Sequence, residues 1–247
     1  MTLSHFDLPG QDHPIPCRHF LPLLSPRRVV LGVHGFAGDK DSSVLTALGE
    51  ALCDRGDALV CFDLPAHGAS TAPDHHLRLS HCKDDLLTVA HYVRATWPQA
   101  NYGLFATSFG ALVTLLCQDE LTDFDVVLRA PAITMAQTFP EVILPCGKEE
   151  YRLAGGAWCG FERKMFVPWA FYTDLLAAEL PAPNRPTLVI HGTADDLIPF
   201  QAVQQWAHQH PQLQLHPIPG ADHRFKGAGE LEAIVTLTLD WFGSQTP

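Results

Sequence analysis

Short apolar runs alternate along the chain with longer segments whose apolar residues recur every three or four positions. The runs "RRVVLGVHG" and "DALVCFDLP" are rich in valine and leucine and close on glycine or proline, which is typical of buried strands. The segment "HCKDDLLTVAHYVRATW" instead spaces its apolar residues so that they share one face of a helix. The chain is therefore expected to alternate strand with helix.

This alternation extends over most of the sequence. Strands are predicted at Arg27–Gly35, Asp57–Pro65, Asn101–Thr107, Asp125–Arg129, Arg185–Gly192 and Leu213–Gly220. Helices are predicted at Ser42–Gly56, His81–Trp97, Phe109–Gln118, Gln201–His208 and Glu230–Phe242. Because the connections are short, right-handed crossovers follow, and we predict an α/β fold with a mostly parallel, doubly wound sheet.

Two parts of the chain depart from this alternation. Residues 1–26 are rich in proline and polar residues and are predicted to form an antiparallel hairpin at the sheet edge. Residues 130–180 hold several prolines, two tryptophans and a Gly-Gly pair, and such a stretch is too long for a bare loop in a compact domain. We therefore expect a core domain of residues 1–129 and 181–247, with residues 130–180 inserted as a small cap.

Composition limits the classes of partner. The 247 residues carry a formal net charge of -11, which argues against nucleic acid or an anionic membrane surface as a partner. No apolar run is long enough to span a bilayer, and the N-terminus lacks the form of a signal peptide. The seven cysteines are scattered without C-x-x-C spacing, so we expect reduced thiols in a cytoplasmic protein. The sequence does not determine the oligomeric state, and a homodimer is one of the alternatives that stay open.

Three residue types that together make a nucleophilic site follow three different strands. Ser108 comes directly after the strand Asn101–Thr107, in the string "ATSFG". Asp195 follows the strand that ends in "HG", and His223 follows the last strand in "GADHRF". Because the carboxyl ends of parallel strands meet at one edge of the sheet, the serine, the acid and the histidine are expected to converge there.

These strings resemble the motifs of the α/β-hydrolase superfamily over nearly the whole chain. "ATSFG" is similar to the nucleophile elbow G-x-S-x-G, with Ala106 in the place of the first glycine. The order serine, acid, histidine is also that of the superfamily. "HGTAD" resembles its acid turn, "GADH" its histidine loop, "HGF" its oxyanion loop and "FDLPAHGAS" its D-x-x-G-H-G-x-S turn. Several motifs in the right order are far more specific than one serine-containing string.

The resemblance implies a role for each of these residues. Ser108 is the nucleophile, His223 the general base, and Asp195 the carboxylate that orients the imidazole ring. The backbone N–H groups of Phe36 and Phe109 are implied as the donors that stabilise the oxyanion. This chemistry uses no cofactor and no metal, so we expect neither. The histidine-rich string "DHHLRLSHC" matches no common zinc spacing and is interpreted as a solvated loop.

The identity of the acid and of the substrate-binding residues is less tightly constrained. Asp195 has the spacing of the superfamily, whereas Asp196 could cap the next turn and Asp222 could brace its own loop. Trp158 and Trp169 are expected either to line an apolar substrate pocket or to hold together a small core of the cap. The other aromatics with this expectation are Phe161, Phe166, Phe171 and Tyr172.

The function expected from these residues is that of a serine hydrolase acting on small-molecule carboxylic esters through an acyl-enzyme. The short chain, the "HGF" loop and the modest cap resemble small cytoplasmic esterases of the cinnamoyl (feruloyl) esterase and monoacylglycerol lipase type. Short-to-medium acyl or aromatic esters are expected to be preferred over highly charged ones. Two other hypotheses stay open: the same triad acting on a thioester, amide or C–C bond, and a catalytically silent hydrolase fold used for binding.

Overall fold

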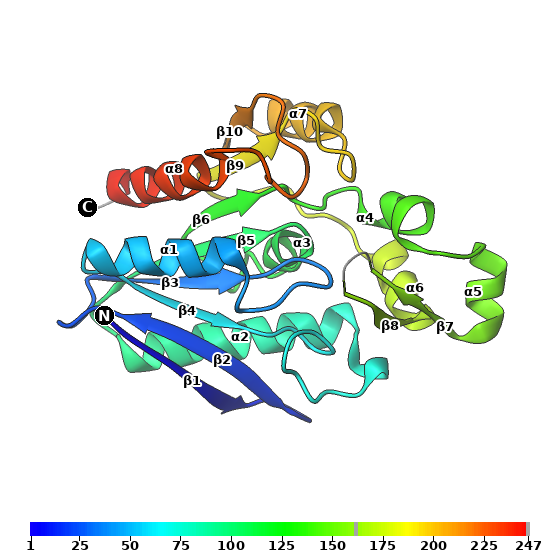
Figure 1. Cartoon of the computed structure of the whole chain (residues 1–247), viewed down its shortest axis with the longest axis horizontal. Coiled ribbons are helices and arrows are strands. Elements are labelled where there is room, and N and C mark those ends of the chain that lie inside the picture. The colour runs from blue at the N-terminus through cyan, green and yellow to red at the C-terminus, as the bar shows by residue number, and fades with distance from the viewer. Residues whose placement is uncertain (161–162, 246–247) are drawn as a thin grey trace.

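The computed structural model describes residues 1–160 and 163–245. Within them the main element is an eight-stranded sheet with the order β1-β2-β4-β3-β5-β6-β9-β10 (Figure 1). The strands are β1 (Thr2–Pro9), β2 (Pro14–Leu21), β3 (Arg28–Val33), β4 (Ala58–Phe62), β5 (Asn101–Thr107), β6 (Phe124–Arg129), β9 (Thr187–Gly192) and β10 (Leu213–Ile218). Neighbouring strands from β4 to β10 run parallel, and β1 and β2 form an antiparallel hairpin at one edge. The predicted α/β class is confirmed.

Helices cover both faces of this sheet. The longer ones are α1 (Ser43–Asp54), α2 (Leu79–Thr96), α3 (Phe109–Leu116), α7 (Phe200–Gln209) and α8 (Glu230–Ser244), and a short 3-10 turn, η1, spans Asp74–His76. On one face α1 and α8 bury residues such as Leu45 and Phe242 against Phe105 of β5. On the other face α2, α3 and α7 bury residues such as Leu86 and Val203. All six residues of β3 are buried between these layers, which explains its continuous apolar sequence.

The chain between β6 and β9 forms a separate set of short elements, and we call residues 130–180 the insertion. These elements are α4 (Met135–Thr138), η2 (Phe139–Ile143), α5 (Lys148–Ala154), β7 (Gly156–Cys159), β8 (Met165–Pro168) and α6 (Trp169–Ala177). β7 and β8 pair as an antiparallel two-stranded sheet that the sequence pattern does not predict. Figure 1 shows the insertion beyond the carboxyl ends of the strands, at the right of the view.

Polar and aromatic contacts fasten the insertion to the rest of the chain. The Arg78 guanidinium donates two hydrogen bonds, both of 2.6 Å, to the Asp174 carboxylate of α6. The ring of Phe36, which follows β3, lies 6.1 Å from the rings of Phe139 and Phe171, measured between centroids. Among the described helices, none combines the length and the apolar character needed to cross a bilayer.

Candidate active site

The turn between β5 and α3 holds Ser108 in a strained backbone conformation. Its φ of 52° and ψ of -114° lie in a region that residues other than glycine rarely occupy. Neighbouring backbone fixes this conformation, because the Ser108 N–H donates to the Arg129 carbonyl oxygen at 2.9 Å. The Ser108 carbonyl oxygen accepts from the N–H groups of Ala111 and Ala132 at 3.0 Å and 3.2 Å. The change from strand β5 to helix α3 therefore takes place at this single serine, as it does in the nucleophile elbow motif.

Small residues let other segments approach this turn closely. A Cβ atom on Gly110 would lie 2.3 Å from the His34 carbonyl oxygen, so a larger residue requires the backbone to move. A Cβ atom on Gly35 would lie 3.2 Å from the Cβ atom of Ser108. Ala106 stands where the motif has its first glycine, and its methyl group is fully buried within β5. The fold thus accommodates the one departure from the motif.

The structure brings Ser108, His223 and Asp195 into one hydrogen-bonded chain. His223 Nε2 lies 3.0 Å from Ser108 Oγ, and His223 Nδ1 lies 2.8 Å from Asp195 Oδ2. The Asp195 side chain is fully buried, whereas that of His223 is 11% exposed. Because an ionised carboxylate can only accept, Nδ1 donates to Asp195, which leaves Nε2 free to accept the serine proton.

The Asp195 carboxylate is held ionised by the turn that follows β9. Its Oδ1 atom accepts hydrogen bonds from the N–H groups of Leu197 and Ile198 at 2.9 Å and 2.7 Å. Burial opposes ionisation, but the hydrogen bond and charge of His223 and the Ile198 N–H outweigh it and hold the pKa of Asp195 below its ordinary value. Burial lowers the pKa of His191, whose Nε2 lies 3.3 Å from Asp195 Oδ2. His191 is therefore neutral, and it packs beside the Asp195 carboxylate without forming an ion pair with it.

The two other candidate acids lie elsewhere. Asp196 is exposed on the turn after β9. The Asp222 carboxylate accepts hydrogen bonds from the N–H groups of Arg224 and Phe225 at 2.9 Å and 2.6 Å, and so braces the loop that carries His223. Of the three candidate acids, Asp195 is the one that contacts His223 through its side chain.

The loop after β3 presents the backbone of Phe36 next to the elbow. A tight turn forms there, in which the Gly38 N–H donates to the Gly35 carbonyl oxygen at 3.0 Å and Ala37 has a φ of 57°. Among the backbone hydrogen bonds of the described residues, none uses the N–H of Phe36 as a donor. Phe109 is the first residue of α3, and N–H groups at a helix start have no acceptor within the helix. Both N–H groups thus lie on segments that flank Ser108, and neither has a backbone acceptor among the described residues.

His34 supports this loop through a fixed tautomer. Its Nε2 accepts a hydrogen bond from the Leu64 N–H at 3.1 Å, so Nδ1 carries the proton and donates to the Gly35 carbonyl oxygen at 2.8 Å. The pKa of His34 is lowered because the ring is buried. A neutral, doubly hydrogen-bonded ring braces the backbone instead of exchanging protons with a substrate.

Ser108 and His223 open onto a cavity of about 640 Å³, which we call the Ser108 cavity. Its wall combines the loop after β3, the insertion, the turn after β9 and the loop of His223. The apolar side chains that the insertion and the β9 turn contribute are Ala132, Met135, Ile143, Leu197 and Ile198. A pocket of this size accommodates a small organic molecule.

The two tryptophans expected near the substrate are not among the described residues that line this cavity. Trp158 is 61% exposed, and its ring packs against Phe166 across the β7–β8 hairpin. The Trp169 ring lies 5.2 Å from that of Tyr151 and 5.4 Å from that of Tyr172, inside the insertion. Phe171 and Tyr172 are buried, and Phe161 lies outside the described residues.

Arg129, at the end of β6, lines the cavity although no motif marks it. Its side chain is buried, its Nη2 donates to the Arg224 carbonyl oxygen at 2.8 Å, and its guanidinium carbon lies 4.6 Å from the centre of the Phe225 ring. Burial lowers the pKa of Arg129 to about 10, so the group stays cationic at neutral pH. The sequence gives one indication of its position: Arg129 is the single charged residue in the apolar run "VVLRAP".

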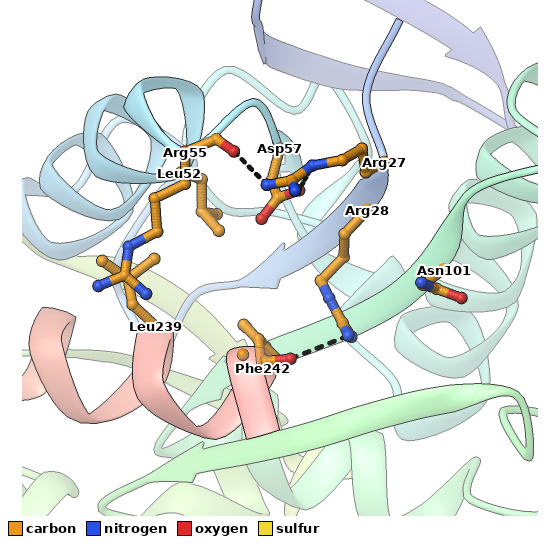
Figure 2. A pocket seen from close by; sticks show the side chains of 9 residues that line it. Arg27, Arg28, Leu52, Arg55, Asp57, Asn101, Leu239 and Phe242 are labelled. Atoms are coloured by element: carbon orange, nitrogen blue, oxygen red, sulfur yellow. Dashed lines mark hydrogen bonds and ion pairs between the residues drawn. The ribbon is translucent and has the colours of Figure 1, made fainter. Parts of the chain in front are cut away.

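A second cavity, of about 310 Å³, lies at the amino ends of the strands (Figure 2). Its arginines are engaged by neighbouring groups. Arg27 donates to the Arg55 carbonyl oxygen at 2.5 Å, and Arg28 donates to the Phe242 carbonyl oxygen at 3.0 Å and to Asp125 at 2.5 Å. The contacts of Arg28 tie α8 and β6 to the start of β3, which gives this cavity a structural role.

The parallel sheet, the elbow and the order of elements define the protein as an α/β hydrolase. Within that class the chain belongs to the family described as serine aminopeptidase, S33, whose sequence profile matches residues 24–157. A comparison with curated proteins finds no match to the sequence.

Solved structures with the same fold span nearly the whole chain. Est1E from Butyrivibrio proteoclasticus, solved with ferulic acid bound, is 19% identical and has a TM-score of 0.82, covering 96% of this chain and 99% of that chain. Alpha/beta hydrolase domain-containing protein 10 from mouse is 17% identical with a TM-score of 0.79, covering 98% and 100%. A serine hydrolase without a lid from Xanthomonas campestris is 23% identical with a TM-score of 0.70, covering 100% and 96%. These likenesses concern the fold.

Proposed function

We propose that the protein is a carboxylic ester hydrolase that uses Ser108, His223 and Asp195 as a catalytic triad. The observation that carries this proposal is the unbroken hydrogen-bonded chain from Ser108 Oγ through His223 to the buried Asp195 carboxylate, at the wall of a cavity large enough for a small ester. A serine hydroxyl is a weak nucleophile until a base takes its proton, and this chain supplies that base.

In the first half of the reaction, Ser108 Oγ bonds to the ester carbonyl carbon while His223 Nε2 takes the hydroxyl proton. The carbonyl oxygen becomes an oxyanion, to which the N–H groups of Phe36 and Phe109 donate. The C–O bond to the alcohol then breaks, and the alcohol oxygen takes the proton from His223. The acyl group remains on Ser108. Asp195 stays ionised throughout and stabilises the imidazolium, in keeping with its lowered pKa.

In the second half, a water molecule takes the place of the alcohol. His223 removes a proton from the water as its oxygen bonds to the acyl carbon, and the same two N–H groups hold the second oxyanion. The bond to Ser108 Oγ breaks, Oγ regains a proton from His223, and the carboxylic acid leaves. No atom outside the chain, the ester and one water molecule is required.

We further propose that the insertion acts as a cap over Ser108. Met135, Thr138 and Ile143 of the insertion line the Ser108 cavity, and the segment leaves the sheet at the end of β6, beside the elbow. Apolar side chains at such a position favour an apolar acyl chain and exclude water. The acyl preference is therefore assigned to Met135 and Ile143 and not to the tryptophans.

Phe36 is expected to act through its backbone, so Phe36→Leu should retain ester hydrolysis to within roughly tenfold, because every residue except proline keeps the N–H group. The same variant should lose roughly 1 kcal/mol of stability, since the ring packs against Phe139 and Phe171. Steady-state kinetics and a thermal melt measure the two effects. A loss of activity as large as that of Ser108→Ala would give the ring itself a chemical role, against this mechanism.

The tryptophans are expected to contribute stability and not acyl selectivity. Trp169→Ala should cost roughly 2 kcal/mol or more because its ring packs between Tyr151 and Tyr172, whereas Trp158→Ala should cost little because its ring is mostly exposed. Ile143→Ala should change the ranking of acetyl, butanoyl and octanoyl esters. A chain-length series and a melting curve for each variant test this; a changed ranking in Trp158→Ala would contradict it.

The bond that is cleaved can be identified with substrates that share one acyl group. A butanoyl group carried as an ethyl ester, an ethyl thioester, an N-ethylamide and a 1,3-diketone isolates the leaving group from the pocket. We expect the ester to be hydrolysed with the highest kcat/KM and in dependence on Ser108. Preferred cleavage of another member would assign the triad to that bond, and no cleavage at all would favour a catalytically silent fold.

The thiols fit a reducing compartment, and we propose the cytoplasm. All seven cysteines are free, and six of them are buried. Burial raises the pKa of Cys17 and Cys117 to about 12, so these groups stay protonated and unreactive.

A further inference from the structure

Arg129 lies beside the serine elbow through its backbone. It is the last residue of β6, and in the sheet register it is paired with Thr107, the residue that precedes Ser108 on the chain. The Arg129 carbonyl oxygen accepts the hydrogen bond of the Ser108 N–H at 2.9 Å. The backbone of Arg129 therefore helps to hold the nucleophile in its strained conformation.

The side chain of Arg129 reaches the loop that carries His223. Its Nη2 atom donates to the Arg224 carbonyl oxygen at 2.8 Å, and its guanidinium carbon lies 4.6 Å from the centre of the Phe225 ring. Phe225 has a φ of 55°, a conformation that a bulky residue keeps only when its surroundings support it. The guanidinium of Arg129 supplies one such support, on the two residues that follow His223.

The other side of this loop is tied to the turn of the acid. Ala221 lies two residues before His223, and its carbonyl oxygen accepts a hydrogen bond from the Ala194 N–H at 3.0 Å. Ala194 directly precedes Asp195 in the turn after β9. His223 is thus flanked by two anchors, of which one joins its loop to the acid and the other, through Arg129, joins it to the elbow.

Stability alone does not account for a buried cation at this position. Arg129 is only 7% exposed, its Nε atom is buried without a hydrogen-bond partner among the described residues, and no ion pair in that part of the chain includes it. Burial lowers the pKa of Arg129, and the charges of Asp195, Asp222 and Glu230 offset this only in part. An incompletely paired buried charge costs free energy, and an apolar side chain of similar volume often leaves a fold equally stable. The contacts of Arg129 with the loop of His223 give it a different role.

We infer that Arg129 is a positioning residue for the ester hydrolysis: it holds the loop of His223 against the elbow, so that His223 Nε2 stays within hydrogen-bond distance of Ser108 Oγ. This inference rests on the proposed function and extends it to a residue outside the triad. Arg129 acts through His223 and takes no part in moving the serine proton. Its planar guanidinium bonds a carbonyl oxygen and packs on an aromatic ring at once, so lysine is not an equivalent residue there.

Arg28 is the matched control, because it makes the same kinds of contact at the amino ends of the strands (Figure 2). It is 4% exposed, it donates to the Phe242 carbonyl oxygen at 3.0 Å, and its guanidinium carbon lies 5.3 Å from the centre of the Phe242 ring. It also forms an ion pair with Asp125. Arg28→Met therefore removes a buried arginine with a carbonyl contact and a ring contact, at the edge of the sheet opposite to the candidate site.

The test measures kcat and KM on 4-nitrophenyl acetate, with kcat expressed per serine that a fluorophosphonate probe labels at completion. Arg129→Met should lower this kcat by roughly 100-fold, the cost of a displacement of about 1 Å between reacting groups, and should leave KM within about threefold. Arg28→Met should keep kcat within about threefold and lower the melting temperature by roughly 5 °C. Counting labelled serines removes the contribution of unfolded molecules.

Rescue experiments test the guanidinium itself. Because Arg129 lines the Ser108 cavity, Arg129→Ala leaves a space that opens to this cavity and can admit a guanidinium ion. At about 20 mM guanidinium chloride, kcat of Arg129→Ala should rise by about fivefold or more over its value in sodium chloride of equal concentration, whereas Arg28→Ala and the unmodified protein should show no rise. Arg129→Lys keeps the charge without the planar fork and should recover only part of kcat.

The outcomes separate this inference from the proposed function. An unchanged kcat per labelled serine in Arg129→Met, an equal loss in Arg28→Met, or a loss confined to KM would overturn the inference and leave ester hydrolysis intact. Absence of turnover of every ester by the unmodified protein would instead overturn the proposed function. The rate of fluorophosphonate labelling at Ser108 would still test Arg129 in that case, because labelling needs the same alignment of His223; it should be slowed in Arg129→Met and not in Arg28→Met, and equal rates would overturn the inference.

Discussion

Replacing Ser108 by alanine is expected to lower kcat for ester hydrolysis by roughly 10⁴–10⁶, because the variant lacks the hydroxyl that forms the acyl-enzyme in the proposed mechanism. His223→Ala should cause a loss of similar size, since Ser108 Oγ then has no base at its 3.0 Å hydrogen bond. The measurement is kcat on 4-nitrophenyl acetate for each variant, with a melting curve to establish that each protein is folded.

The double variant, Ser108→Ala with His223→Ala, distinguishes a catalytic pair from two unrelated residues. Residues that act as a unit lose their effect together, so the double variant should be little slower than either single variant. Independent contributions would instead multiply the two losses. Full turnover by Ser108→Ala would remove the basis of the proposed function.

The second large effect is expected at Asp195. Asp195→Asn should lower kcat by about 10⁴, because an amide N–H facing His223 Nδ1 stabilises the wrong tautomer of the ring. The asparagine oxygen can still accept the hydrogen bonds from Leu197 and Ile198, so the turn after β9 should persist. Kinetics on the same ester, together with a melting curve, separate loss of chemistry from loss of fold.

Asp196→Asn is the matched control, since it removes the same charge one residue away. Asp196 is exposed, so we expect its variant to keep activity within roughly threefold of the unmodified protein. The opposite ranking of the two variants would mean that the neighbouring carboxylate is the acid that serves His223.

Much of the fold could be predicted because its signals are local and repeated. The apolar run at β3 predicts a strand buried on both faces, and all six of its residues are buried. The β7–β8 hairpin could not be predicted, because its strands have four residues each and carry no alternating pattern. Strands that short acquire their conformation from the packing around them.

The part of the candidate site that the sheet topology determines could be predicted, whereas the part that side-chain packing determines could not. Ser108, Asp195 and His223 each follow a strand of the parallel sheet, so their order and strand positions suffice to bring them to one edge. The structure adds the hydrogen bonds among them, and their catalytic role stays a prediction. Arg129 could not be found in this way, because an arginine at a strand end is ordinarily a solvated residue.

The positions of the two tryptophans also depend on side-chain packing, so the sequence could not predict them. An aromatic-rich segment predicts contacts among rings but not which rings face a cavity. In the structure Trp169 packs between Tyr151 and Tyr172, and Trp158 is exposed on the hairpin. Met135 and Ile143, two of the insertion's side chains that do line the cavity, are unremarkable in sequence.

The central claim is that Ser108 is a nucleophile activated by His223. Labelling with a fluorophosphonate probe, followed by intact-mass and peptide mass spectrometry, tests it most directly, because the probe bonds only to an activated serine oxygen. The account predicts one adduct per chain, located on Ser108, absent from Ser108→Ala and strongly slowed in His223→Ala. A folded, unmodified protein that forms no adduct, or forms it on another residue, would contradict the account.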